Sequence, residues 1–144
     1  MHKFVIHTDG GSRDNPGPAA IGIIIESTET GKKEYGEYIG IATNNEAEYK
    51  AIIFALKKLK HLIGNNKAKD SEVGFYLDSE LLVKQLSHEY KVKDEGIQKL
   101  FLEVYNLEID FGSIIFHHIR REKNKGADRL VNQVLDKESS KLNI

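Results

Sequence analysis

Four acidic residues, in four separate stretches of the chain, stand where a carboxylate is costly to keep. Asp9 and Asp78 each end an apolar run, Glu48 lies on the apolar side of a predicted helix, and Asp128 lies near the start of the last predicted helix. Burying a carboxylate is unfavourable unless a cation pairs with it. A pair of divalent metal ions would supply that charge, and Mg²⁺ and Mn²⁺ prefer carboxylate oxygen as a ligand.

The position of Glu48 on its helix distinguishes it from the nearby Glu46. Glu48 shares a line with the apolar residues Ile52 and Ala55, and this line must face the sheet. Glu46 lies on a different line, where it can pair with Lys50 in water. We therefore expect Glu48 to be the functional residue and Glu46 to lie at the surface.

Asp9 and Asp78 each end a predicted strand. Ligands of open α/β sheets gather at the carboxyl ends of strands, and parallel neighbours would bring these two side chains together. Structural explanations stand beside this one. Asp78 could cap the following helix, and Asp9 could form a turn before Gly10. Asp128 would be favoured by the dipole of its helix, although its spacing to Val131 directs it toward the packed side.

The elements that must position these residues follow from the hydrophobic periodicity. Three strands come first, followed by a helix, a strand, two helices, a strand and a final helix, which predicts a mixed α/β sheet covered by helices. The polar connector 64–70 is long enough to be mobile. The predicted strands are residues 3–8, 20–26, 35–40, 73–78 and 113–119, and the predicted helices are residues 44–63, 79–87, 94–109 and 124–142.

The length and composition predict one globular domain spanning residues 1–144. The chain has no cysteine, which excludes disulfides and zinc–thiolate sites. No apolar stretch reaches the length of a signal peptide or a membrane span, so we expect a cytoplasmic protein without a membrane partner. We also expect a monomer, because no long apolar stripe is left over at the surface.

Four motifs in order resemble the type 1 ribonuclease H family, over a stretch from Phe4 to about Leu135. They are TDGGSRDNPGP, TNN-x-x-E, L-D-S and N-x-x-A-D. The resemblance implies a five-stranded mixed sheet of order 3-2-1-4-5 flanked by helices. It also implies that Asp9 bridges two Mg²⁺ or Mn²⁺ ions, that Asp128 helps to hold one of them, and that Glu48 and Asp78 hold the other.

The activity implied by the resemblance is cleavage of the RNA strand of RNA–DNA hybrids, which leaves 5′-phosphate and 3′-hydroxyl ends. The resemblance also implies substrate contacts. Thr43 and Asn44 could instead cap the helix that they precede, and Asn15 could form a turn before Pro16. The implied contacts are Gly11, Ser12 and Glu48 with ribose 2′-hydroxyl groups, Asn15, Asn44 and Asn45 with the minor groove, and Thr43 with a DNA phosphate.

The chain departs from the family's better-known bacterial members between Asp78 and His118. Those members carry a longer insert there, a basic handle rich in Trp and Lys, and this chain has no Trp. Tyr90, Lys91 and Lys93 could be a reduced substitute. The net charge of −1 argues weakly against a nucleic-acid partner, and basic clusters are most often solvated faces.

A residue that assists turnover has two candidates. His118 lies ten residues before Asp128, as a family histidine does, and Arg121 lies in an R-E-x-N motif found in members that lack the handle. We favour Arg121, because His117 and His118 fall on or just after the last strand, where one of them is expected to point inward.

Two other functions remain open from the sequence. A binding module on the same fold would use the basic surface without cutting, although it would have no reason to keep four clustered acids. A Mg²⁺-dependent phosphatase is the other, and no GxxxxGK phosphate-binding loop supports it.

Overall fold

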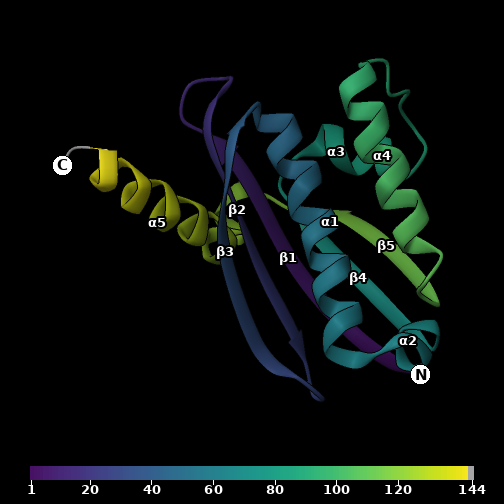
Figure 1. Cartoon of the computed structure of the whole chain (residues 1–144). Coiled ribbons are helices and arrows are strands. Elements are labelled where there is room, and N and C mark those ends of the chain that lie inside the picture. The colour runs from purple at the N-terminus through teal and green to yellow at the C-terminus, as the bar shows by residue number, and fades with distance from the viewer. Residues whose placement is uncertain (143–144) are drawn as a thin grey trace.

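The computed structural model describes residues 1–142, and these form a single five-stranded sheet with helices on both faces (Figure 1). The strand order across the sheet is β3-β2-β1-β4-β5, which confirms the predicted order. β1 pairs antiparallel with β2 and parallel with β4. The strands are β1 (His2–Ser12), β2 (Gly17–Ser27), β3 (Gly31–Ala42), β4 (Ser71–Leu77) and β5 (Ser113–His118).

The helices form two layers. α1 packs on β1 and β2 with α4 beside it, and α5 packs on β1, β2 and β3 (Figure 1). The predicted bounds of the first long helix, residues 44–63, are confirmed. The helical elements are α1 (Asn44–Ile63), α2 (Asn65–Lys69), α3 (Glu80–Leu86), α4 (Glu95–Glu108), the 3₁₀ turn η1 (Arg121–Lys123) and α5 (Lys125–Leu142).

Two glycines allow the helices to approach the sheet closely. A Cβ atom on Gly10 would collide with the backbone of Ala47 in α1, and one on Gly22 would collide with the carbonyl oxygen of Ala127 in α5. Gly10 pairs with Ile21, the residue next to Gly22, so the two glycines lie on opposite faces of the sheet. α1 and α5 are therefore layers on opposite sides of β1 and β2.

β1 is longer than predicted, which excludes the alternative of a turn at Asp9. Residues 9–12 continue the pairing with β2, with Asp9 opposite Gly22 and Ser12 opposite Ala19. The glycines that follow Asp9 thus belong to the strand. The small size of Gly10 serves the packing of α1 rather than a reversal of the chain.

The polar connector 64–70, which is long enough to be mobile, contains the short helix α2. Ala68 is fully buried, and its carbonyl oxygen accepts a hydrogen bond from the backbone N–H of Gly112 (3.2 Å). The Ser71 hydroxyl donates to the carbonyl oxygen of Lys67 (2.6 Å). A single alanine among polar residues gives no periodic signal, so its anchoring role is visible only in three dimensions.

The core lies mainly between the sheet and the layer of α1 and α4. Its largest buried side chains include Phe4 and Ile6 of β1, Phe75 of β4, and Ile52 and Leu56 of α1. Burial of this apolar surface supplies the main driving force for folding.

Two lysines of α1 form ion pairs with acidic residues in α4 and just beyond its end. Lys57 Nζ lies 3.1 Å from Glu103 Oε1, and Lys60 Nζ lies 3.0 Å from Asp110 Oδ2. These lysines are thus engaged in ion pairs within the fold.

The sheet face over β4 and β5 is open to solvent. His7, Tyr76 and His117 stack across β1, β4 and β5, with ring centroids 5.3 and 4.8 Å apart. Both His117 and His118 are exposed, so the expectation that one of them points inward is wrong. α5 covers β1, β2 and β3, which leaves β4 and β5 without a helix on this face.

Within residues 1–142, no helix combines the length and the apolar character needed to span a bilayer.

Candidate active site

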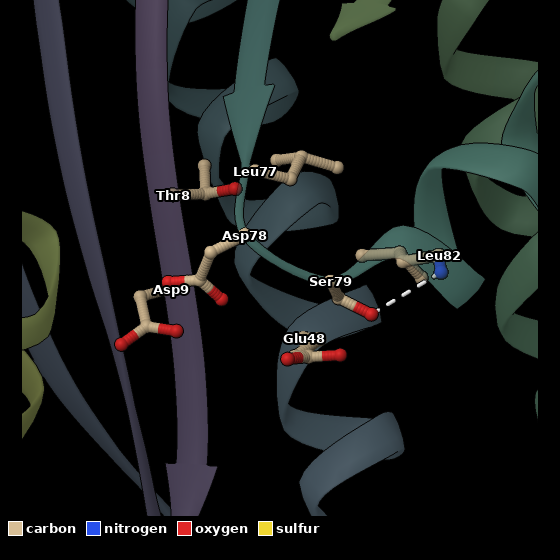
Figure 2. Close-up of a pocket in the computed structure, with 7 residues that line it drawn as sticks. All are labelled: Thr8, Asp9, Glu48, Leu77, Asp78, Ser79 and Leu82. Atoms are coloured by element: carbon tan, nitrogen blue, oxygen red, sulfur yellow. Dashed lines mark hydrogen bonds between the residues drawn. The ribbon is translucent and has the colours of Figure 1, made fainter. Parts of the chain in front are cut away.

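The parallel pairing of β1 and β4 brings Asp9 and Asp78 together. The last registered pair of these strands is His7 with Tyr76, and each aspartate stands two residues beyond it. Figure 2 shows both carboxylates at the side of the same small cavity, together with Glu48 from α1. The expectation that parallel neighbours would join these two residues is confirmed.

Glu48 reaches this site because the first turn of α1 lies directly on β1. Thr43 is the N-cap of α1, and its hydroxyl accepts a hydrogen bond from the Glu46 N–H (3.1 Å). Glu46 Oε1 in turn accepts from the Thr43 N–H (2.9 Å), which completes a capping box. Glu46 therefore fixes the start of the helix. The ion pair with Lys50 that the sequence suggested is not formed. A Cβ on Gly10 would lie 2.6 Å from the Glu48 nitrogen, so only glycine permits this approach.

Asp9, Glu48 and Asp78 form a compact acidic group. Each offers one carboxylate oxygen, and these oxygens lie within 4.8 Å of one another. Asp128 stands in the first turn of α5, half-buried and outside this compact group, and its negative charge acts on Asp9. The structure thus brings three of the four predicted ligands into direct proximity and the fourth into electrostatic range.

The protonation of these groups reflects their surroundings. Burial, followed by the charges of Asp78, Asp128 and Glu48, raises the pKa of Asp9 to about 8. Burial also raises the pKa of Glu48 to about 7, against a hydrogen bond from Ser79 and the charge of Arg121, which lower it. Without another cation, these carboxylates hold protons near neutral pH.

The donor set fits hard divalent cations. It consists of carboxylate oxygens, it is partly shielded from water, and its protons are ready to be displaced by positive charge. Asp9, Glu48 and Asp78 could hold one ion directly, and Asp128 adds a carboxylate on the α5 side of Asp9.

The geometry decides the roles of Asp78 and His7. The N-cap of α3 is Ser79, whose hydroxyl accepts from the Leu82 N–H (3.2 Å), so Asp78 is not needed for capping (Figure 2). His7 is half-buried and stacked on Tyr76, and burial lowers its pKa. His7 is therefore a packed residue of the sheet.

Three of the residues expected to contact substrate, Ser12, Asn15 and Asn44, form a hydrogen-bonded group. Asn44 Oδ1 accepts from the Ser12 N–H (2.9 Å) and the Ser12 hydroxyl (3.2 Å), and Asn15 Oδ1 accepts from the Asn44 N–H (2.9 Å). Asn15, Thr43, Asn44 and Asn45 line a groove of about 590 Å³. The turn between β1 and β2 is thereby fixed to the start of α1.

Arg121 and His118 differ in their relation to the site. The guanidinium of Arg121 lowers the pKa of Glu48 by its positive charge, which places it within electrostatic range. His118 is exposed at the end of β5, in register with Leu77. Tyr90, considered with Lys91 and Lys93 as a substitute for the basic handle, has its ring centroid 5.1 Å from Lys84 Nζ.

Sequence reasoning missed two residues of the site. Ser79 lowers the pKa of Glu48, and buried Asn124 donates to Asp78. Both stand in the motifs L-D-S and N-x-x-A-D, beside residues that were assigned. The motifs indicated that these positions matter, and only the fold shows which atoms they contact.

Comparison with known proteins agrees with this architecture. Residues 7–134 match the family described as Reverse transcriptase-like. The solved structure of LC11-RNase H1, isolated from compost by a metagenomic approach, is 42% identical, with a TM-score of 0.86 over 96% of this chain and 99% of that one. This chain belongs to the type 1 ribonuclease H family. Ribonuclease HI of Halobacterium salinarum is 36% identical over 89% of this chain and 62% of its own length.

Another member of the ribonuclease H family shows the same fold within a longer protein. The bifunctional protein Rv2228c of Mycobacterium tuberculosis is 38% identical over 93% of this chain, which spans 36% of its length. The solved N-terminal RNase H domain of that protein has a TM-score of 0.87 at 35% identity, over 99% of both chains.

Proposed function

We propose that this ribonuclease H family member is a metal-dependent endonuclease that hydrolyses the RNA strand of RNA–DNA hybrids. The observation that carries the proposal is the convergence of Asp9, Glu48 and Asp78 at the carboxyl ends of β1 and β4. LC11-RNase H1, at 42% identity, has been solved in complex with an RNA/DNA hybrid, which supports the choice of substrate. The expected products carry 5′-phosphate and 3′-hydroxyl ends.

In this proposal, Asp9, Glu48, Asp78 and Asp128 together hold two Mg²⁺ or Mn²⁺ ions. When bound, such ions neutralise the charge that develops on the entering and departing oxygens of the phosphodiester. The protein keeps the four carboxylates on rigid elements, because β1, β4, α1 and α5 are packed through the core. Ser79 lines the same cavity as Glu48. The site therefore needs little rearrangement when substrate arrives.

Recognition of the hybrid is assigned to the groove beside the carboxylates. Both bonds from Ser12 engage the amide oxygen of Asn44, which leaves its two amide hydrogens to other partners. The minor groove presents acceptors and, on an RNA strand, 2′-hydroxyl groups. Amide hydrogens of Asn44, Asn15 and Asn45 suit those acceptors. Gly11 and Ser12 follow Asp9 near the end of β1, and the proposal assigns them the contacts with ribose 2′-hydroxyl groups.

The test is a cleavage panel of labelled RNA–DNA hybrid, duplex RNA, duplex DNA and single strands, each with Mg²⁺, with Mn²⁺ and with chelator. The proposal predicts metal-dependent cutting of the RNA strand of the hybrid, and its loss in Asp9→Asn. Hybrid binding without metal-dependent cutting would overturn the proposal and favour a non-cleaving module. Turnover of a chromogenic phosphate ester without cutting of hybrid would favour a phosphatase.

A further inference from the structure

Asn124 occupies the junction between three elements of the proposed site. It follows η1, and its backbone N–H donates to the carbonyl oxygen of Arg121 (2.9 Å). Its own carbonyl oxygen accepts from the Asp128 N–H (3.2 Å), in the first turn of α5. The side chain is only 1% exposed. Asn124 thus links the Arg121 turn to the start of the helix that carries Asp128.

The side chain of Asn124 joins β1 to the end of β4. Its Nδ2 donates to the carbonyl oxygen of Thr8 (2.9 Å) and to Asp78 Oδ2 (3.3 Å). Thr8 stands one residue beyond the last β1–β4 pair and directly precedes Asp9. The amide nitrogen therefore takes the place of a backbone donor where β4 ends, and it fixes the Asp78 carboxylate relative to the backbone that carries Asp9.

The orientation of this amide is determined by its partners. Thr8 offers a carbonyl oxygen and Asp78 a carboxylate oxygen, so only the NH₂ group can face both. Asn124 Oδ1 is buried and has no hydrogen-bond partner within residues 1–142. An unsatisfied buried oxygen lowers stability. Keeping an asparagine here at that cost indicates a role beyond packing.

We propose that Asn124 is a positioning residue for divalent cation binding, which rests on the function proposed above. Its NH₂ group holds Asp78 at a fixed distance and orientation from Asp9 in the absence of the ion. Carboxylates that are already oriented lose less conformational freedom on binding, so the affinity for the ion rises. Because the bond is made to Asp78, the contribution of Asn124 depends on that carboxylate.

The experiment measures Mn²⁺ affinity by calorimetry, in the absence of nucleic acid, for the wild type, Asn124→Ala and the matched control Asn132→Ala. Asn132 is an exposed asparagine on α5, whose Nδ2 donates to the carbonyl oxygen of Asp128 (3.1 Å). We expect Asn124→Ala to weaken Mn²⁺ binding about tenfold or more, as loss of a partner of a metal ligand does. Asn132→Ala should stay within about twofold of the wild type, because its bond leaves Asp78 untouched.

A double-mutant comparison separates positioning from a general effect on the fold. In an Asp78→Ala background, Asn124→Ala should change Mn²⁺ affinity by less than about threefold, since the carboxylate it orients is gone. An equal loss in both backgrounds, or wild-type affinity in Asn124→Ala, would overturn the inference. If Asn124→Ala does not fold, Asn124→Ser serves with the same criteria, because a hydroxyl has one hydrogen and cannot serve both acceptors. A wild type that binds no Mn²⁺ would refute the proposed function itself.

Discussion

Acidic residues near the two ends of strand β1 lie in opposite electrostatic settings. Beside its start, Glu29, in the turn between β2 and β3, receives a hydrogen bond from His2 Nδ1 (2.7 Å) and lies 2.9 Å from Lys67 Nζ. The hydrogen bond from Lys67, and then His2, lower the pKa of Glu29. Near its other end, Asp9 faces Asp78 and Glu48, and burial and these like charges raise its pKa to about 8.

This contrast separates charge that serves the fold from charge that serves chemistry. A paired acid at the surface adds a little stability and needs nothing further. Clustered acids without paired cations reduce stability, and such groups persist where a ligand or a reaction needs them. The carboxylate beside the start of β1 already has cationic partners, whereas the acidic group near the other end gains one only when an external cation binds.

The largest expected effect is that of removing one charge from the acidic end. Asp9→Asn should reduce hybrid cleavage by about a thousandfold or more, because it removes a ligand between the other carboxylates. The same change should raise the melting temperature in chelator, since it relieves repulsion with Asp78 and Glu48. Cleavage assays test the loss of activity, and thermal unfolding tests the rise in melting temperature. A variant that still cleaves at the wild-type rate would contradict the distinction between the two ends.

The second effect is a fall in stability as pH rises in the presence of chelator. The folded pKa values of Asp9 and Glu48, about 8 and 7, lie above those of the unfolded chain. The folded state therefore holds protons that the unfolded chain has lost, and stability declines from about pH 4.5 until it levels off near pH 8. For two coupled, partly solvated groups we expect the free energy of unfolding to fall by about 2 kcal/mol over this range. Urea unfolding measures it.

The control for this pH effect is the double variant Asp9→Asn, Glu48→Gln. Its unfolding free energy should depend less on pH across the same range, because the two groups no longer titrate. An unchanged pH dependence in the double variant would show that other residues cause the decline.

A smaller effect is expected from the cation nearest the acidic end. Arg121→Ala should lower kcat about tenfold, since the Arg121 charge acts on Glu48. His118→Ala should change kcat by less than about twofold, because its side chain lies exposed at the end of β5. Steady-state measurement of kcat decides between Arg121 and His118, with His117→Ala as a control on the same edge strand as His118. A larger loss in His118→Ala would reverse the assignment.

The smallest effect is expected at the paired end. Glu29→Gln should lower the melting temperature slightly at low salt, and the difference should shrink at high salt, because exposed ion pairs are screened. Cleavage of hybrid should stay at the wild-type level. Thermal unfolding at two salt concentrations tests this, and a loss of cleavage in Glu29→Gln would mean that the two ends are not independent.

Local signals in the sequence were sufficient for the order of elements and for the acidic group. The 3.6-residue period predicted the helix at residues 44–63, and the same period selected Glu48. The succession of strands and helices indicated a mixed sheet, and its order, 3-2-1-4-5, came from the family resemblance. Asp9 and Asp78 lie close together because β1 and β4 are parallel neighbours, as predicted.

Features that depend on tertiary contacts could not be predicted in the same way. The continuation of β1 beyond Asp9 depends on pairing with β2, and the role of Gly10 depends on the approach of α1. α2 is anchored by one buried residue, Ala68, within a polar segment. Asn124 lies far along the chain from Thr8, and its bonds exist only because α5 returns to β1. No local pattern encodes such contacts.

The most direct test of the central claim is the number of protons released when Mg²⁺ binds at about pH 7. Calorimetry in two buffers of different ionisation enthalpy gives this number. The account predicts release of roughly one proton, because the ion displaces protons held by Asp9 and Glu48, and a clearly smaller release in Asp9→Asn, where only Glu48 contributes. Mg²⁺ binding without proton release, or equal release in Asp9→Asn, would contradict it.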